Sequence, residues 1–166
     1  MKSLRETIRQ LILEEAQVDH IDEHPYFEAL RNYVDYASAD YWQGIIKIHH
    51  SDGCSTEAFI AINDEDDKGG IWIDKLEVVN KETRKIDPEC FRKGYAKQML
   101  QALTRAADET GTHLTLIAAH EPYLSRQYPH VDFPDKDELA ALYGDYGFFE
   151  EYSNYAQVKM NRAPKS

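Results

Sequence analysis

The chain has 166 residues, of which 42% are hydrophobic and 30% charged, and its formal net charge is −11. This length and composition favour one soluble domain with a genuine core, and the acidic balance argues against general nucleic-acid binding, which needs a basic face. No apolar run reaches membrane-spanning length and no signal-peptide pattern is evident, so we expect a cytoplasmic protein without membrane or nucleic-acid partners. The charge instead suits a cationic small molecule or a basic protein segment.

The chain contains two cysteines, Cys54 and Cys90. Two are too few for a disulfide scaffold, and a cytosolic protein normally keeps its thiols free. We therefore expect both to be reduced. Nothing in the sequence around Cys90 indicates a lowered pKa, so we interpret it as structural rather than reactive.

The first part of the chain predicts two helices. Four aliphatic residues recur at helical spacing and predict an amphipathic helix over residues 3–16: Leu4, Ile8, Leu11 and Ile12. Ser3 and Glu6 have the spacing of a capping box at its start. Pro25 suits the first position of a second helix. The apolar stripe of the first helix can pack on its own domain, or it can dock on a partner or a second copy of the chain.

Three strands are predicted next, over residues 44–50, 57–63 and 71–79. The connections are a Ser-Asp-Gly turn at 51–53 and a polar run at 64–70, both typical of tight turns and loops. Connections this short predict an antiparallel meander. The third strand is long and unbroken.

The second half alternates helices with strands. We expect helix, strand, loop, helix and one or two strands over residues 93–110, 113–119, 121–134, 135–146 and 148–160. Gly111 is a natural stop for the first of these helices, and Asp135 is a plausible cap for the second. The order predicts a single α+β (mixed α/β) domain over residues 1–166.

A possible anion site lies at the start of the helix over 93–110, in the segment Phe91-Arg92-Lys93-Gly94-Tyr95-Ala96. A helix N-terminus presents free N–H groups and the positive end of the dipole, which favours phosphate. Gly94 would let a phosphate approach the backbone, and Arg92 and Lys93 add positive charge. Taken alone, the segment fits an ordinary strand-to-helix turn with one glycine better than an anion site.

Three motifs occur in a fixed order along the chain: Leu76-Glu77-Val78, Phe91-x-x-Gly94-x-Ala96 and Leu142-Tyr143-x-x-x-Gly147-Phe148. Together they resemble the GNAT superfamily of N-acetyltransferases, whose second motif has Gln or Arg where this chain has Phe91. The resemblance covers residues 44–160. It implies a central, mostly antiparallel twisted sheet flanked by helices, with the helix at 1–16 as an addition.

The resemblance also implies a reaction, in which an amine attacks acetyl-CoA directly and takes its acetyl group. The expected cofactor-binding residues are Val78, Val79, Arg92, Lys93, Gly94, Tyr95 and Ala96. Backbone N–H groups of 92–96 would bind the pyrophosphate, and the backbone of Val78 would polarise the thioester carbonyl. Tyr143 matches the family's general acid, which protonates the leaving thiolate, and we favour that role over the alternative of a core tyrosine with a satisfied hydroxyl.

Three residues are candidates for the base that deprotonates the amine. The resemblance implies Asp74 as the first candidate, and Glu77, on the same long strand, is the second. The third is His120, which ends a later strand. An acidic residue on a strand is more commonly a solvated side chain, and His120 a loop residue. The acidic and aromatic loop at 121–134, with Tyr123 and Tyr128, would suit a cationic amine or would simply anchor itself.

Two further function classes stay open. The chain could be a catalytically inactive binding module that keeps the fold, a possibility to which Phe91 gives some weight. It could also be a protein-interaction subunit that docks through its first helix. We expect no metal site, since His20 and His24 are four residues apart but flank a helix break without a cysteine partner.

Overall fold

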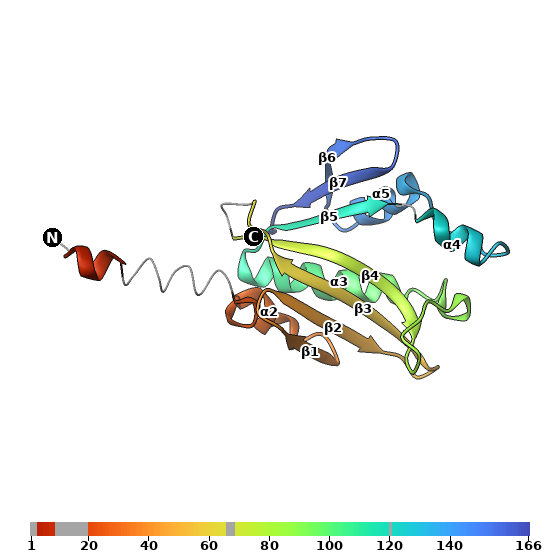
Figure 1. The fold of residues 1–166 in the computed structure, drawn as a ribbon, viewed down its shortest axis with the longest axis horizontal. Coiled ribbons are helices and arrows are strands. Elements are labelled where there is room, and N and C mark those ends of the chain that lie inside the picture. Colours follow the sequence, from red (N-terminus) through yellow and green to blue (C-terminus); the bar gives the residue numbers. More distant parts are fainter. Residues whose placement is uncertain (1–2, 9–19, 66–68, 120) are drawn as a thin grey trace.

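The computed structural model describes residues 3–8, 20–65, 69–119 and 121–166 and shows a mixed α+β fold (Figure 1). From residue 20 onward, its α-helices and 3-10 helices are η1 (Ile21–Glu23), α2 (Pro25–Leu30), η2 (Pro88–Cys90), α3 (Tyr95–Thr110), α4 (Pro122–Gln127) and α5 (Lys136–Gly144). Its strands are β1 (Tyr36–Ala39), β2 (Gln43–His49), β3 (Cys54–Ile62), β4 (Ile71–Asn80), β5 (Leu114–Ala119), β6 (Phe149–Ser153) and β7 (Gln157–Arg162).

The strands form one seven-stranded sheet in the order β1-β2-β3-β4-β5-β7-β6. Every neighbouring pair is antiparallel except β4 and β5, which are parallel. The predicted fold class, the mostly antiparallel sheet and the three-stranded meander are therefore confirmed. Strand β1 was not predicted, because Tyr36-Ala37-Ser38-Ala39 contains no β-branched aliphatic residue and no strict alternation.

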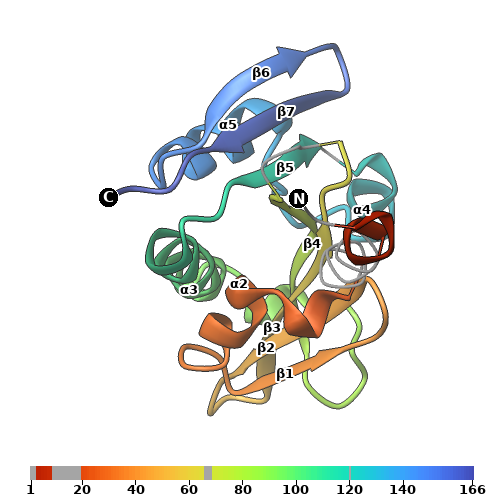
Figure 2. The same ribbon diagram turned by 90° about the vertical axis from the view of Figure 1, so that its left-hand side faces the viewer.

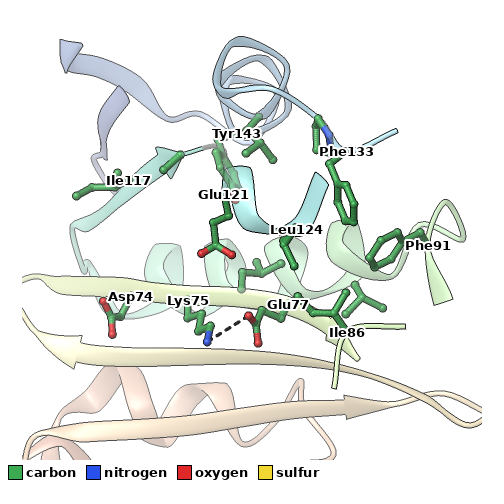
Figure 3. Close-up of a pocket in the computed structure, with 15 residues that line it drawn as sticks. Asp74, Lys75, Glu77, Ile86, Phe91, Ile117, Glu121, Leu124, Phe133 and Tyr143 are labelled. Carbon is green, nitrogen blue, oxygen red and sulfur yellow. Dashed lines mark ion pairs between the residues drawn. The ribbon is translucent and has the colours of Figure 1, made fainter. Parts of the chain in front are cut away.

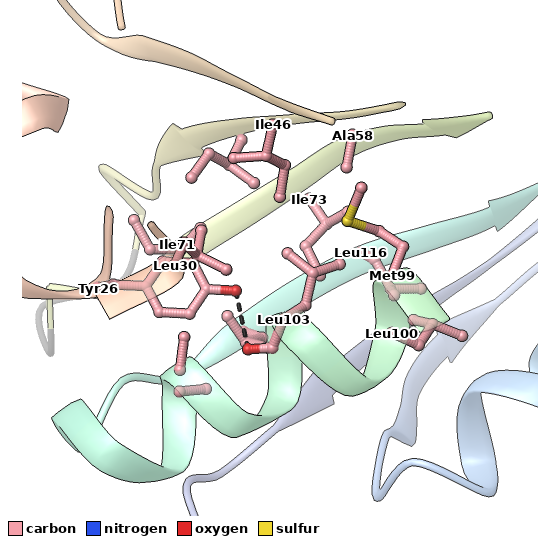
Figure 4. Close-up of a cluster of buried hydrophobic side chains, with 14 of the residues drawn as sticks. Tyr26, Leu30, Ile46, Ala58, Ile71, Ile73, Met99, Leu100, Leu103 and Leu116 are labelled. Atoms are coloured by element: carbon pink, nitrogen blue, oxygen red, sulfur yellow. Dashed lines mark hydrogen bonds between the residues drawn. The ribbon is translucent and has the colours of Figure 1, made fainter. Parts of the chain in front are cut away.

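One apolar core lies between the sheet and the helices α2 and α3, which lie side by side (Figure 2). The ring of Tyr26 is fully buried there, and its hydroxyl donates a 2.9 Å hydrogen bond to the Leu103 carbonyl of α3 (Figure 4). Ile21, Phe27 and Leu30 are also fully buried in this core. The core thus extends beyond residues 44–160, since α2 and the 3-10 helix before it are integral to it.

The predicted helix ends are largely confirmed. Gly111 closes α3 in the left-handed conformation at φ +66°, and Pro25 occupies the start of α2. Asp135 and Glu138 form a reciprocal capping box at the start of α5. The predicted loop over 121–134 was wrong in part, because Pro122 begins the short helix α4, a position where its missing N–H costs nothing.

The buried Arg162 fixes the position of α5. Its guanidinium makes a bidentate pair with Asp108 of α3, at 2.8 and 3.1 Å, and donates to the Tyr146 carbonyl just after α5. A buried charge is tolerated only when it is paired and hydrogen-bonded in this way. The contacts tie β7, α3 and the end of α5 together, and α5 carries Tyr143.

The expectation of two free thiols was wrong, because Cys54 and Cys90 form a disulfide. The fold brings the start of β3 and the end of η2 together across 36 residues of chain, a proximity that local sequence patterns do not encode. Disulfides persist mainly in oxidising compartments. The cysteines therefore no longer support the expectation of a cytosolic protein. No helix in the described part of the chain is long and apolar enough to cross a bilayer.

The predicted N-terminal helix is only partly within the described residues. Residues 4–8 are helical, and the predicted capping box is present, with Glu6 N donating to Ser3 Oγ and Ser3 N donating to Glu6 Oε2. Leu4 and Ile8 are exposed. The remainder of its apolar stripe, Leu11 and Ile12, lies outside the described residues, so docking through this helix stays a prediction.

Candidate functional site

The candidate site begins where the parallel pair β4–β5 comes apart. The two strands pair only over residues 71–73 and 114–116, after which β4 continues along β3 and β5 along β7. Figure 1 shows the strands separating in the direction of α4. Because strand pairing uses up backbone N–H and C=O groups, the separation leaves the side of residues 74–78 that faces β5 without a strand partner in the described chain.

A β-bulge marks the point of separation. Phe59 pairs with Lys75 and Ile60 pairs with Ile73, so Asp74 has no partner on β3. A bulge inserts one residue, bends the strand and increases its twist, and it is a common device next to functional sites. The bulge in β4 therefore turns the strand away from β5 and opens the sheet.

A cavity of about 330 Å³ occupies the opening. It is lined on β4 by Asp74, Lys75, Leu76, Glu77 and Val78, and on the opposite side by Ile117, Ala119, Glu121, Leu124, Leu139 and Tyr143. In Figure 3, Glu121 points across the opening toward β4. All three predicted catalytic residues, Asp74 and Glu77 of β4 and Tyr143 of α5, thus line one cavity, although the two elements are far apart in sequence.

A second cavity, of about 340 Å³, adjoins the first and is formed by the Gly94 turn, which we define as residues 90–96. The predicted residues Arg92, Lys93, Gly94, Tyr95 and Ala96 all line it. Leu76, Val78 and Tyr143 line both cavities. Val79 lines neither, since its side chain is fully buried in the sheet beside Ser55.

The Gly94 turn has the backbone of an anion site. Gly94 is the N-cap of the 16-residue helix α3 at φ +77°, and no side chain caps its free N–H groups. Arg92 is also left-handed, at φ +61°. A Cβ at Gly94 would meet no atom within 4 Å, so the glycine is required by its backbone conformation and leaves the helix start open.

The two cations of the Gly94 turn already have partners. The Lys93 ammonium lies 2.7 Å from an Asp52 carboxylate oxygen, and Arg92 lies 3.7 Å from Asp132. The Arg92 pair is largely exposed on both sides, so it contributes little stability and can exchange for another anion.

Phe91, at the position where the GNAT motif has Gln or Arg, has a packing role. Its ring meets Phe133 edge-to-face at 5.6 Å, and both rings line the two cavities. Phe133 and Leu124 were not predicted as site residues. They come from the loop and the short helix after β5, where the sequence offers no periodic pattern.

The acidic groups of the first cavity differ in their surroundings. Glu77 pairs with Lys75 at 3.2 Å, whereas Asp74 at the bulge is exposed. Glu121 accepts a hydrogen bond from Tyr123, which raises the pKa of that phenol. Tyr128, the other aromatic of this loop, anchors it instead by donating to the Ile86 carbonyl at 3.1 Å. In the predicted acidic and aromatic loop, Glu121 therefore faces the cavity and Tyr128 anchors the loop. The third base candidate, His120, lies outside the described residues.

Tyr143 is partly buried near the end of α5, with its ring edge-to-face to Phe148 at 6.2 Å. Burial raises the pKa of its phenol, because the charged phenolate is poorly solvated there. The hydroxyl is protonated at neutral pH, as an ordinary tyrosine also is.

The described residues contain no cluster of three or more His, Cys, Asp or Glu side chains arranged to hold a metal ion. His24 caps α2, accepting from Tyr26 N, and its other ring nitrogen contacts the Gly69 carbonyl. His20 contacts Asp22.

No protein-family model matches the chain, and no curated protein matches it. Among solved structures, it is similar to PH1933 from Pyrococcus horikoshii OT3, with 16% sequence identity and a TM-score of 0.40 over 70% of this chain and 68% of that one. A likeness this distant carries no argument about function.

Proposed function

We propose that the chain is a GNAT-type N-acetyltransferase that moves the acetyl group of acetyl-CoA to a primary amine by direct attack. The observation that carries the proposal is the opening between β4 and β5, where Glu77, Val78, Tyr143 and the Gly94 turn line two cavities that share part of their walls. A cofactor and an acceptor need separate approaches to one reacting point, and two adjoining cavities with shared walls provide them.

The cofactor would enter from the second cavity. Its pyrophosphate would accept hydrogen bonds from N–H groups of the Gly94 turn at the start of α3. Its thioester would lie beside residues 76–78, whose backbone has no strand partner toward β5 in the described chain, so that an N–H group there can stabilise the oxyanion that develops on the carbonyl.

The amine would enter from the first cavity. Asp74 and Glu77 line it and are candidates to remove the proton from the ammonium, directly or through water. Tyr143 would then protonate the leaving thiolate of CoA. Three carboxylates and one lysine among the lining residues favour an amine that carries positive charge, either a small molecule or a protein amine. Such an acceptor would compete with Lys75 for Glu77.

The decisive experiment measures thiol release from acetyl-CoA across a panel of mono-, di- and polyamines and lysine peptides. Tyr143→Phe should lower the turnover number about 100-fold and leave CoA affinity within twofold, since proton transfer by a positioned side chain contributes about 10²–10⁴-fold. Tyr146→Phe is the matched control, because Tyr146 lies three residues further on and lines neither cavity.

A second candidate is a binding module that holds a CoA-like ligand without transfer. The Phe91–Phe133 pair favours it, since an apolar pair lines both cavities at a place where the resembling family has a polar side chain. CoA binding without thiol release from any amine would favour the module over the enzyme. Thiol release that depends on Tyr143 would exclude it.

A further inference from the structure

The Gly94 turn is fastened to the turn between β2 and β3 at three of its residues. Cys90 is bonded to Cys54 through the disulfide. Lys93 and the Tyr95 hydroxyl each lie 2.7 Å from the same carboxylate oxygen of Asp52. We call His50, Asp52 and Cys54 the clasp, because each of them contacts the Gly94 turn.

His50 adds a fourth contact. Its ring stacks on Tyr95 with centroids 3.5 Å apart and an interplanar angle of 9°. The stack and the hydrogen bond act on one side chain, so Tyr95 is held both by its face and by its hydroxyl. Tyr95 is the first residue of α3, and its orientation therefore sets the direction in which the helix begins.

The fastened residues alternate with residues in the left-handed conformation. Arg92, at φ +61°, lies between Cys90 and Lys93, and Gly94, at φ +77°, lies between Lys93 and Tyr95. A left-handed non-glycine residue is disfavoured and persists only where its surroundings enforce it. Left-handed residues among ordinary ones are the kind of backbone from which anion-binding nests are built, so the conformation of this segment bears directly on the anion site.

Asp52 joins the two turns. One of its oxygens accepts from Cys54 N at 3.1 Å within its own turn, and the other binds Lys93 and Tyr95 of the Gly94 turn. Hydrogen bonds from Lys93 and Tyr95 hold the pKa of the Asp52 carboxyl well below its usual range, so it is charged at neutral pH. Lys93 is thereby committed to the clasp and contributes to the anion site through its backbone.

We propose that Asp52 is a positioning residue of the anion site, which acts through Lys93 and Tyr95 to keep the N–H groups of the Gly94 turn in the orientation that a pyrophosphate requires. This inference rests on the proposed function for the identity of the ligand. It assigns Asp52 no part in acetyl transfer itself.

The test compares Asp52→Asn with Asp35→Asn. The first change keeps the size of the side chain and removes the charge that binds Lys93, whereas Asp35 accepts from His49 N at 2.7 Å, on the neighbouring strand β2. We expect Asp52→Asn to raise the dissociation constant for CoA and the KM for acetyl-CoA about tenfold. A change of this size corresponds to the loss of one charged hydrogen bond of ordinary strength. The turnover number at saturating acetyl-CoA should change less than twofold, and Asp35→Asn should leave all three within twofold.

A second variant and a second measurement separate positioning from general loss of folding. Tyr95→Phe removes only the hydroxyl and keeps the ring stacked on His50. Its effect on CoA affinity should not add to that of Asp52→Asn, because both changes act on the hydrogen bond between Tyr95 and Asp52. Amide hydrogen exchange of residues 91–97, measured without CoA, should be at least several-fold faster in Asp52→Asn, while exchange in α2 and β5 stays as in the wild type.

The outcomes distinguish the two proposals. Unchanged exchange at 91–97, or unchanged CoA affinity in Asp52→Asn when the wild type binds CoA, overturns the positioning role and leaves the proposed function intact. A wild type that binds CoA, loses affinity through Asp52→Asn and yet releases no thiol with any amine supports positioning and contradicts the acetyltransferase. A wild type that binds neither CoA nor inorganic pyrophosphate overturns both.

Discussion

The two ends of the β4–β5 pair differ in how they are held together. At the closed end, residues 71–73 pair with 114–116, and the side chains of Ile71, Ile73, Leu114 and Leu116 are all buried in the core. At the open end, the same strands separate and their residues line two cavities. One pair of strands thus provides core at one end and a candidate site at the other.

The comparison explains how the protein keeps its shape around two cavities. Apolar burial holds the closed end, where side chains from α2, α3 and the sheet fill the interior. The cavities leave less apolar surface to bury at the open end, and there the contacts are a disulfide, the Asp52 hydrogen bonds and the stack of His50 on Tyr95. Covalent and polar links fix the shape where packing does not.

The largest expected effect comes from breaking the covalent link of the open end. The Cys54→Ser/Cys90→Ser double variant should lower the free energy of unfolding by about 4 kcal/mol, since the disulfide closes a loop of 36 residues in the unfolded chain. Urea unfolding with and without a dithiol reductant measures it. A reductant should reduce the stability of the wild type and leave the double variant unchanged; equal wild-type stability in both conditions would contradict the disulfide.

The closed end should respond to loss of packing. Leu116→Ala should cost about 3 kcal/mol of unfolding free energy, because Leu116 is 3% exposed in the core and its removal leaves a cavity. Ile117→Ala, on the same strand, should cost less than about 1 kcal/mol, since Ile117 is 41% exposed and faces the opening. Similar urea midpoints for the two variants would show that the closed end is not the better packed region.

The two ends of α3 offer a matched pair of glycines for the comparison. Gly94 and Gly111 have φ values of +77° and +66°, and a Cβ at either would meet no atom within 4 Å. Each change to alanine should therefore cost about 1–2 kcal/mol of stability through backbone strain alone. Isothermal titration with CoA should show a loss of affinity for Gly94→Ala and none for Gly111→Ala. Equal affinities in both variants would remove the Gly94 turn from the proposed site.

The smallest expected effect is a pH dependence at the clasp. Burial lowers the pKa of His50, against opposing contributions from Asp52 and Asp35, while His49 adds to the lowering. The imidazole of the unfolded chain therefore binds a proton at a higher pH than the imidazole of the folded protein. The contribution of His50 to the free energy of unfolding is fully present above about pH 6.5, and it is lost as the pH falls below that value toward the lowered pKa of the folded state. His50→Phe keeps a ring on Tyr95 and should show a smaller fall in urea midpoint between about pH 7.5 and 5. A fall as steep as in the wild type would assign the dependence to other histidines.

Local signals in the sequence predicted most of the elements. Gly111, Asp135 and Pro25 were identified as helix ends because each acts within one turn of the chain, and β2, β3 and β4 were identified by their composition and short connections. The motif residues Glu77, Gly94 and Tyr143 were named as site candidates from the sequence, and they line adjoining cavities.

Contacts between distant segments could not be predicted from the sequence. The disulfide, the bulge at Asp74 and the clasp around Asp52 join residues far apart in the chain, and the parallel pairing that opens into the cavities depends on α3 crossing from β4 to β5. No spacing along the chain encodes such contacts, because they arise from the packing of whole elements. Local patterns in the sequence predicted α2, α3, α5, most strands and the turn at Gly94, whereas packing between elements sets what that turn contacts and which side chains surround the opening.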